Sequence, residues 1–344
     1  LCTCNMEPTT PSLPDDDVAA IDRLGAIYKE LSAELSKIII GQQRVVELLS
    51  IALFSRGHAL LMGVPGLAKT LLISSVAKTP DLSFNRIQFT PDLMPADITG
   101  TDIIQDDSAG GKRQFEFIKG PVFANIVLAD EINRAPAKTQ SALLEAMEER
   151  QVTIGRKSYH LPPLFLVMAT QNPLEQEGTY PLPEAQLDRF MLHLELDYPS
   201  AIDELSILRL NHAESRVESN PTPPQLTQLQ IFAARQYALQ VIAAAPIENY
   251  IVNLATATRH PQAYDPDLAR WLAYGVSPRS SIALLRCARV RAWLAGRNYV
   301  TPEDIQYCIY PVMRHRLMLT VEAEADGITT KDVISLLLQK VVVA

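Results

Sequence analysis

An eight-residue segment between an apolar run and a helical pattern has the composition of a phosphate-binding loop. It reads Gly63-Val64-Pro65-Gly66-Leu67-Ala68-Lys69-Thr70, and Leu71 continues it into the predicted helix. Glycines let the backbone wrap a phosphate chain with its N–H groups pointing inward, and a helix N-terminus favours negative charge. Lys69 would reach the outer phosphates, and the Thr70 hydroxyl would bind Mg²⁺. The segment predicts a nucleoside-triphosphate site, the alternative being an ordinary Gly/Pro turn before a helix.

One position departs from the usual phosphate-loop pattern. Ala68 stands where a glycine normally precedes the lysine. A Cβ is tolerated there if the residue adopts the right-handed helical conformation. We therefore expect phosphate binding to survive this departure.

Two adjacent acids, Asp130 and Glu131, follow the apolar run 126–129. At the carboxyl end of a strand beside a phosphate loop, Asp130 can bind Mg²⁺ directly or through water. Glu131 can polarise a water for in-line attack on the γ-phosphate. A strand that ends in solvated acids is the alternative, and the preceding phosphate loop favours the catalytic interpretation.

Two further polar residues occupy positions where they could assist hydrolysis. Asn172 follows the apolar run 164–169 and could orient the attacking water, although Asn-Pro also starts turns for local reasons. Arg189 lies near the end of the α/β pattern. It would either pair with Asp188 or Glu184, or project to the γ-phosphate of a neighbouring subunit.

The elements that position these residues alternate between strands and helices. Strands are predicted at 59–62, 87–89, 126–129 and 164–169, and helices at 21–37, at 44–54 and after the phosphate loop to about Lys78. This alternation predicts a doubly wound parallel α/β sheet covered on both faces. After residue 199 the pattern is helical, so we expect a flexible leader (1–17), an α/β core that carries the phosphate loop (18–198) and a helical second domain (199–344).

Composition narrows the classes of function. The 344 residues carry 31 Lys and Arg against 39 Asp and Glu, a net charge of −8, which makes a broad nucleic-acid surface improbable. No apolar run approaches the length of a membrane span, and the first residues do not form a signal peptide. The four cysteines lack metal-ligand spacing, which favours a reducing, cytoplasmic compartment.

Taken together, these motifs resemble those of the AAA+ ATPases and, within them, the MoxR family. The resemblance rests on the phosphate loop with its alanine before Lys69, on the segment 88–100 (QFTPDLMPADITG), and on 130–136 (DEINRAP) running into a helix through 142–149. It extends from about Ile21 to the C-terminus.

The resemblance implies a role for each site residue. Lys69 and Thr70 belong to the Walker A motif, and Asp130 and Glu131 belong to the Walker B motif. Asn172 is sensor 1, and Arg189 is the arginine finger. Arg279 is the sensor 2 arginine that reaches the nucleotide from the lid, and Ile39, Ile40 and Gly41 flank adenine. Arg134 is held in reserve as a second candidate for contact between subunits. ATP and Mg²⁺ are the implied ligands, with the nucleotide between core and lid.

The resemblance also implies a partner and a task. Two hairpins, 101–104 with 114–117 and 151–154 with 158–161, are similar to inserts that related proteins present to a central pore; two solvated hairpins are the alternative. The family forms rings, usually hexameric, and acts with a von Willebrand A-domain protein to mature or activate a client complex, sometimes by metal or cofactor insertion. The alternatives are an AAA+ nucleic-acid motor or loader, and a non-hydrolysing scaffold, against which Glu131 argues.

Overall fold

The computed structural model describes most of the chain. The described residues are 25, 28–29, 32–33, 35–36, 39–64, 66–67, 69–78, 82–106, 113–155, 157–173, 178–214 and 227–343. The predicted leader, most of the predicted helix 21–37, Pro65, Ala68 and the tip of the first hairpin lie outside these residues. The helical conformation expected for Ala68 therefore stays a prediction.

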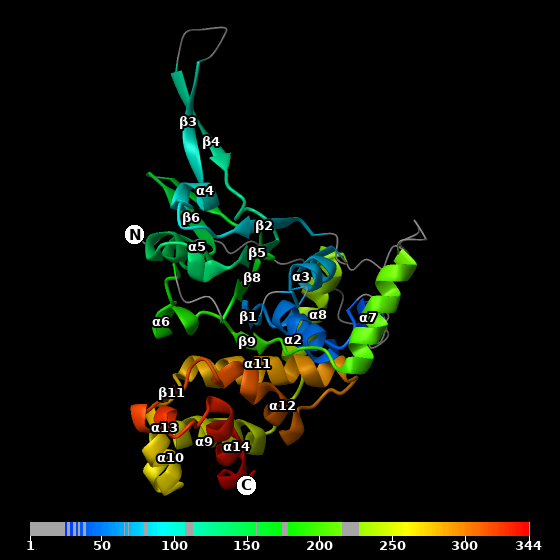
Figure 1. Ribbon diagram of the computed structural model, residues 1–344, viewed down its shortest axis with the longest axis vertical. Coiled ribbons are helices and arrows are strands. Elements are labelled where there is room, and N and C mark those ends of the chain that lie inside the picture. Colours follow the sequence, from blue (N-terminus) through cyan, green and yellow to red (C-terminus); the bar gives the residue numbers. More distant parts are fainter. Residues whose placement is uncertain are drawn as a thin grey trace.

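Five parallel strands form the central sheet, in the order β2-β5-β8-β1-β9 (Figure 1). They are β1 (Ala59–Met62), β2 (Phe84–Gln88), β5 (Ile126–Asp130), β8 (Leu166–Gln171) and β9 (Leu192–Glu195). The four strands predicted from apolar runs are confirmed. The fifth strand, β9, is not predicted from the sequence, because partly exposed His193 and exposed Glu195 interrupt its apolar side chains.

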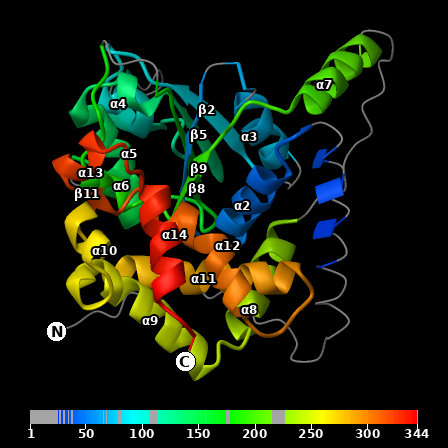
Figure 2. The ribbon, with the colours of Figure 1, turned by 60° about the horizontal axis from the view of Figure 1, so that its bottom comes forward.

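Helices cover both faces of the sheet, as a doubly wound α/β fold requires. The helices of the α/β part are α2 (Gln43–Phe54), α3 (Lys69–Lys78), α4 (Pro95–Thr99), α5 (Ala137–Glu149) and α6 (Glu184–Leu187), with the 3-10 turn η1 (Ile132–Arg134). The next helix, α7 (Ala201–Glu214), follows β9 and projects from the body of the molecule (Figure 2). Side chains that alternate along the strands enter two different cores. One contains Leu61, Leu128 and Met168 with residues of α2, and the other contains Leu60, Val127 and Val167 with residues of α5.

Both predicted hairpins are present. The first, β3 (Gly100–Asp106) with β4 (Arg113–Lys119), projects from the body of the molecule, and the second pairs β6 (Gln151–Ile154) with β7 (Lys157–His160) (Figure 1). Their bases touch, because the rings of Phe117 and Tyr159 stack with centroids 4.1 Å apart. Gly100 permits the first hairpin: its φ is +96°, and a Cβ there would lie 2.2 Å from the Ile118 carbonyl oxygen.

The C-terminal part is largely helical, as predicted. Its helices are α8 (Gln228–Gln240), α9 (Ala245–Arg259), α10 (Pro266–Trp271), α11 (Pro278–Leu294), α12 (Pro302–Met313), α13 (Val321–Ala325) and α14 (Thr330–Lys340), with η2 (Pro261–Ala263). The expectation of helices alone is corrected by one short antiparallel pair, β10 (Leu272–Tyr274) with β11 (Met318–Leu319). No helix among the described residues is both long and apolar enough to cross a membrane.

The helical part packs beside the β9 edge of the sheet and against α2 (Figures 1 and 2). Phe54 of α2 meets Trp293 of α11 edge to face, with ring centroids 5.1 Å apart. Tyr307 of α12 donates a hydrogen bond to Glu47 of α2 at 2.8 Å, and the buried Arg235 guanidinium donates to the Leu53 carbonyl at 2.7 and 3.1 Å. These contacts decide which residues the helical part brings to the sheet.

Candidate functional site

Three neighbouring strands bring the predicted catalytic residues to one edge of the sheet. β5, β8 and β1 are adjacent and parallel, so their carboxyl ends lie side by side. Asp130 ends β5, Gln171 ends β8 and Gly63 follows β1. In open α/β sheets, ligands bind at this carboxyl edge.

The phosphate loop joins β1 to α3, which begins at Lys69. The Lys69 ammonium donates to the Gly63 carbonyl at 2.6 Å and to the Gln171 carbonyl at 3.4 Å, so it lies across the loop. The Thr70 hydroxyl lies 3.4 Å from Asp130 Oδ2. The structure thus brings the two Walker motifs together as predicted by their order in the sequence.

A buried threonine that is not among the predicted site residues contacts both acids. The Thr170 hydroxyl donates to Asp130 Oδ1 at 2.6 Å and accepts from the Glu131 backbone N–H at 2.9 Å. Glu131 has left-handed backbone angles, φ 56° and ψ 50°, which a non-glycine residue adopts at a cost. Thr170 therefore stabilises the unfavourable backbone conformation at Glu131 and at the same time holds the Asp130 carboxylate.

Two residues of β2, also not predicted as site residues, contact the same acids. Arg86 donates to Asp130 Oδ2 from Nη2 at 2.6 Å and from Nε at 3.1 Å. Gln88 donates to Glu131 Oε2 at 2.7 Å. The sequence carries one signal for these two residues: they are two positions apart on a strand, and residues i and i+2 of a strand share a face.

The remaining residues predicted around the nucleotide also lie at this edge. Asn172 follows β8 and is buried, with 4% of its surface exposed. Arg134, the reserve candidate, lies 3.2 Å from Glu131 Oε2 of its own subunit. Ile39 is buried, and Gln42, three residues further along the chain, donates to the Asp197 carbonyl at 2.9 Å in the segment that follows β9.

The other segments predicted to bind nucleotide approach the chain that follows β9. A Cβ at Gly41 would lie 3.0 Å from Asp203 Oδ2, and one at Gly63 would lie 3.0 Å from Leu196 Cβ. Of the remaining predicted positions, Ile40, Val64 and Leu67 are partly exposed, and Gly66 and Leu71 are exposed. The predicted adenine-flanking segment and the phosphate loop therefore share one neighbour, the segment after β9.

The donor atoms at the carboxyl edge fit the ligands that the sequence implies. A hydroxyl on Thr70 and a carboxylate on Asp130 are hard oxygen ligands of the type that Mg²⁺ takes. The N-terminus of the ten-residue α3, with Lys69 at its first position, suits a phosphate chain. Both Mg²⁺ and a nucleoside triphosphate therefore match this edge.

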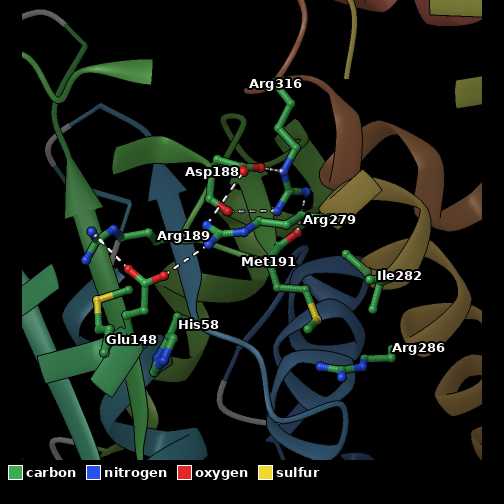
Figure 3. Close-up of a pocket in the computed structure, with 11 residues that line it drawn as sticks. His58, Glu148, Asp188, Arg189, Met191, Arg279, Ile282, Arg286 and Arg316 are labelled. Atoms are coloured by element: carbon green, nitrogen blue, oxygen red, sulfur yellow. Dashed lines mark hydrogen bonds and ion pairs between the residues drawn. The ribbon is translucent and has the colours of Figure 1, made fainter. Parts of the chain in front are cut away.

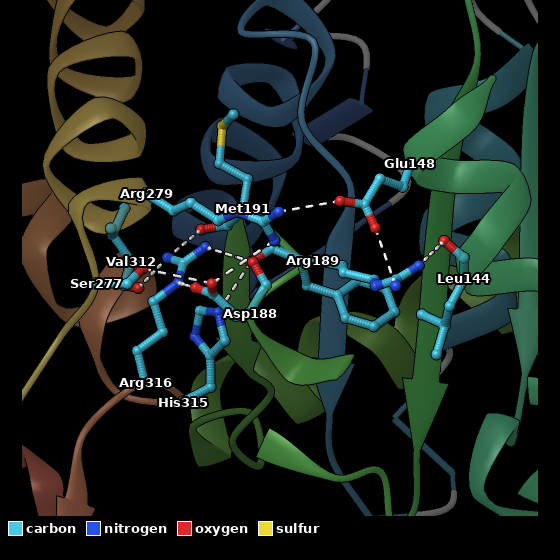
Figure 4. A network of polar contacts seen from close by, with 11 residues as sticks. Leu144, Glu148, Asp188, Arg189, Met191, Ser277, Arg279, Val312, His315 and Arg316 are labelled. Atoms are coloured by element: carbon cyan, nitrogen blue, oxygen red, sulfur yellow. Dashed lines mark hydrogen bonds and ion pairs between the residues drawn. The ribbon is translucent and has the colours of Figure 1, made fainter. Parts of the chain in front are cut away.

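Arg189 and Arg279 lie together at the opposite, amino-terminal edge of the sheet (Figure 4). Arg189 donates to the Leu144 carbonyl at 2.6 Å and pairs with Glu148 at 2.9 Å, rather than with Asp188 or Glu184. Arg279 pairs with the other oxygen of Glu148 at 3.0 Å. One carboxylate thus holds both arginines.

The position of Arg279 differs from the expectation that the lid carries it over the nucleotide of its own subunit. Met191 donates from its backbone to the His58 carbonyl, so Arg189 precedes β9 where β1 also begins. Four strand residues, about 13 Å, separate that edge from the phosphate loop. The reason is the docking of α11 and α12 beside β9 and α2, which leaves the start of α11 at the amino edge.

A buried arginine fixes this arrangement. Arg316, whose side chain is 4% exposed, pairs with Asp188 Oδ1 at 2.7 Å. It also donates to four carbonyl oxygens, those of Asp188 (3.3 Å), Phe190 (2.8 Å), Met191 (3.3 Å) and Val312 (2.5 Å). Arg316 therefore ties the helical part to the chain segment that carries Arg189.

A pocket of about 350 Å³ opens beside these arginines (Figure 3). Of the described residues, four arginines (Arg189, Arg279, Arg286 and Arg316) and two acids (Glu148 and Asp188) line it. His58 forms part of the wall, and burial, reinforced by Arg150, lowers its pKa to about 4. The amino edge is therefore a basic surface on an acidic protein.

Known proteins share both parts of this chain. Residues 58–192 match the model of the ATPase family associated with various cellular activities (AAA), and residues 269–336 match that of the AAA lid domain. Chaperone MoxR1 of Mycobacterium tuberculosis (strain ATCC 25618 / H37Rv) is 46% identical over 310 residues, which cover 90% of this chain and 80% of that protein. Protein MoxR of Methylorubrum extorquens is 34% identical over 83% of this chain and 86% of its own length. A crystal structure from Cytophaga hutchinsonii, 45% identical, superposes with a TM-score of 0.87 and covers 95% of this chain and 97% of its own.

Proposed function

Because the chain belongs to the MoxR family of AAA ATPases, we propose that it hydrolyses ATP with Mg²⁺ and acts as a ring-forming chaperone. The observation that carries the proposal is the division of charged groups between two edges of one sheet. Lys69, Asp130 and Glu131 lie at the carboxyl edge, and Arg189 and Arg279 at the amino edge. Such a subunit offers a nucleotide site on one side and arginines to a neighbour on the other.

Within one subunit, the carboxyl edge binds ATP and activates water. The N-terminal amides of α3 and the Lys69 ammonium bind the phosphates. Thr70 and Asp130 hold Mg²⁺, which when bound neutralises phosphate charge. Glu131 accepts the proton of the attacking water, which Asn172 orients, and the products are ADP and phosphate.

The two arginines at the amino edge complete the site of the adjacent subunit. Arg189 stabilises charge that develops on the transferred phosphoryl group, and Arg279 acts from the same edge rather than on its own nucleotide. Both arginines pair with Glu148 in the single chain, which keeps them together. Hydrolysis then requires a ring, for which the family resemblance favours six copies.

The roles at the carboxyl edge are tested by comparing Lys69→Ala with Glu131→Gln. Lys69→Ala should abolish ATP binding, because it removes a charge that compensates the phosphates. Glu131→Gln should retain binding and lose turnover by about 10² or more, because it removes only water activation. Nucleotide binding and phosphate release are measured on both variants. Equal loss of binding would contradict these roles.

The arginine finger is tested by mixing inactive subunits. Arg189→Ala should lower turnover by about 10³, whereas loss of a partly exposed ion pair would leave catalysis almost unchanged. When Arg189→Ala and Lys69→Ala subunits exchange, an intact ATP site can border an intact Arg189, so ATPase activity should exceed that of both parents. A mixture that stays inactive despite demonstrated exchange would exclude Arg189 as the finger.

The proposed task is the maturation or activation of a client complex together with a von Willebrand A-domain protein, including metal or cofactor insertion. The projecting β3–β4 hairpin supports a contact with the client, and its tip lies outside the described residues. Deleting residues 108–111 should spare basal ATPase and impair remodelling. The Glu131→Gln variant, recovered from the native cell, should retain the client and the partner, and their identification tests this assignment.

A further inference from the structure

Two side chains of β2 contact both Walker B acids at once, and the proposed mechanism gives them no task. β2 pairs with β5 so that Arg86 lies opposite Leu128 and Gln88 opposite Asp130. Arg86 Nη2 donates to Asp130 Oδ2 at 2.6 Å and to Gln88 Oε1 at 2.8 Å. Gln88 Nε2 in turn donates to Glu131 Oε2 at 2.7 Å. The contacts form one chain from Asp130 through Arg86 and Gln88 to Glu131.

The oxygen that Arg86 contacts is the one that faces the phosphate loop. Asp130 Oδ1 accepts from Thr170, while Oδ2 lies 3.4 Å from the Thr70 hydroxyl and takes both Arg86 hydrogen bonds. A cation held by Thr70 and Asp130 would use this same oxygen. A guanidinium and a divalent cation repel each other strongly at such separations.

The exposure of the two partners indicates which one moves. The Asp130 side chain is 10% exposed and the Arg86 side chain 48%. A nearly buried carboxylate needs a compensating cation, whereas a half-exposed arginine can swing its guanidinium into water. Arg86 therefore places a positive charge directly against Asp130 and is the partner that can move away.

We propose that Arg86 is a positioning residue: it acts as an internal cation for Asp130 in the nucleotide-free subunit and withdraws when Mg²⁺ arrives with nucleotide. The inference rests on the proposed ATPase function. It also couples the two acids, because Arg86 fixes the orientation of the Gln88 amide by donating to its oxygen.

The experiment measures Mg²⁺-dependent binding of a fluorescent ADP analogue, which involves no turnover. Arg86→Gln removes the competing charge, so the Mg²⁺ concentration for half-maximal binding should fall about fivefold. Binding of the analogue in EDTA should stay unchanged. Arg86→Lys keeps the positive charge but cannot donate two hydrogen bonds from one planar group, so its half-maximal Mg²⁺ concentration should be intermediate. Gln88→Ala should stay within about twofold of the unmodified chain.

Arg270→Gln is the matched control. Arg270 is 49% exposed and also pairs with carboxylates, those of Glu322 and Asp326, but it lies in the helical part. Its substitution should leave the Mg²⁺ requirement unchanged. If Arg86→Gln needs the same Mg²⁺ concentration as the unmodified chain or a higher one, the inference is overturned, because losing a merely structural arginine would weaken the site. If Arg86→Gln fails to fold, the Mg²⁺ concentration that Arg86→Lys needs decides in the same way. Lack of Mg²⁺-dependent binding by the unmodified chain would refute the proposed function as well.

Discussion

Arg316→Met should detach the helical part from the segment that carries Arg189. The substitution retains an unbranched apolar stem but removes the guanidinium, whose hydrogen bonds reach five acceptor oxygens of the core and of α12. Among the described residues, Asp188, 23% exposed on its side chain, would keep Ser277 at 3.4 Å and Arg279 at 3.8 Å as polar side-chain partners. A partly buried carboxylate would thus lose its closest counterion.

The expected cost is about 3 kcal/mol. Removing one partner of a buried ion pair costs about 3 to 5 kcal/mol, and the partial exposure of Asp188 favours the lower end. Arg270→Met is the control, because Arg270 is 49% exposed and an exposed pair contributes about 0 to 1 kcal/mol. The difference between the two variants isolates the effect of burial.

Urea unfolding followed by tryptophan fluorescence measures this cost. Both tryptophans of the chain, Trp271 and Trp293, lie in the helical part, so the signal reports on the region that Arg316 anchors. With an m-value of about 3 kcal/mol/M, the midpoint of Arg316→Met should fall by about 1 M. A midpoint shift no larger than that of Arg270→Met would refute the reasoning that Arg316 anchors the lid.

Three further predictions follow from single sites. Burial, reinforced by Arg314, lowers the pKa of His193 to about 4. Between pH 6.5 and 4 the unfolded chain binds a proton that the folded chain does not, so the free energy of unfolding decreases by up to about 1.4 kcal/mol for each unit by which the pH is lowered. His193→Phe should therefore reduce the loss of stability that urea unfolding measures between pH 7 and pH 5. Gly100→Ala should cost about 2 kcal/mol or more in thermal unfolding, against about 1 for Gly155→Ala, because a Cβ at Gly100 meets the Ile118 carbonyl whereas one at Gly155 (φ +58°) meets open space; equal costs would contradict this. Thr170→Val leaves the Glu131 N–H without its acceptor and should cost about 1 to 3 kcal/mol with a lower kcat, whereas Thr170→Ser should retain both stability and turnover.

Local patterns in the sequence determined the phosphate loop, the acids and the strands that carry them. A glycine-rich turn before a helix and acids at a strand end are set by neighbouring residues, and the structure brings Lys69, Thr70 and Asp130 to the same edge of the sheet. β9 was missed because an edge strand buries only one face and lacks a continuous apolar run.

Tertiary structure alone decided which charged groups meet. Arg86 and Asp130 are far apart in sequence and meet because β2 pairs with β5, a choice of neighbour that no local spacing encodes. Arg279 meets Glu148 and Asp188 because α11 and α12 pack against α2 and β9. The placement of the lid is the sum of many weak apolar contacts between distant segments, such as Phe54 with Trp293, and these contacts have no direction that a linear pattern could reveal.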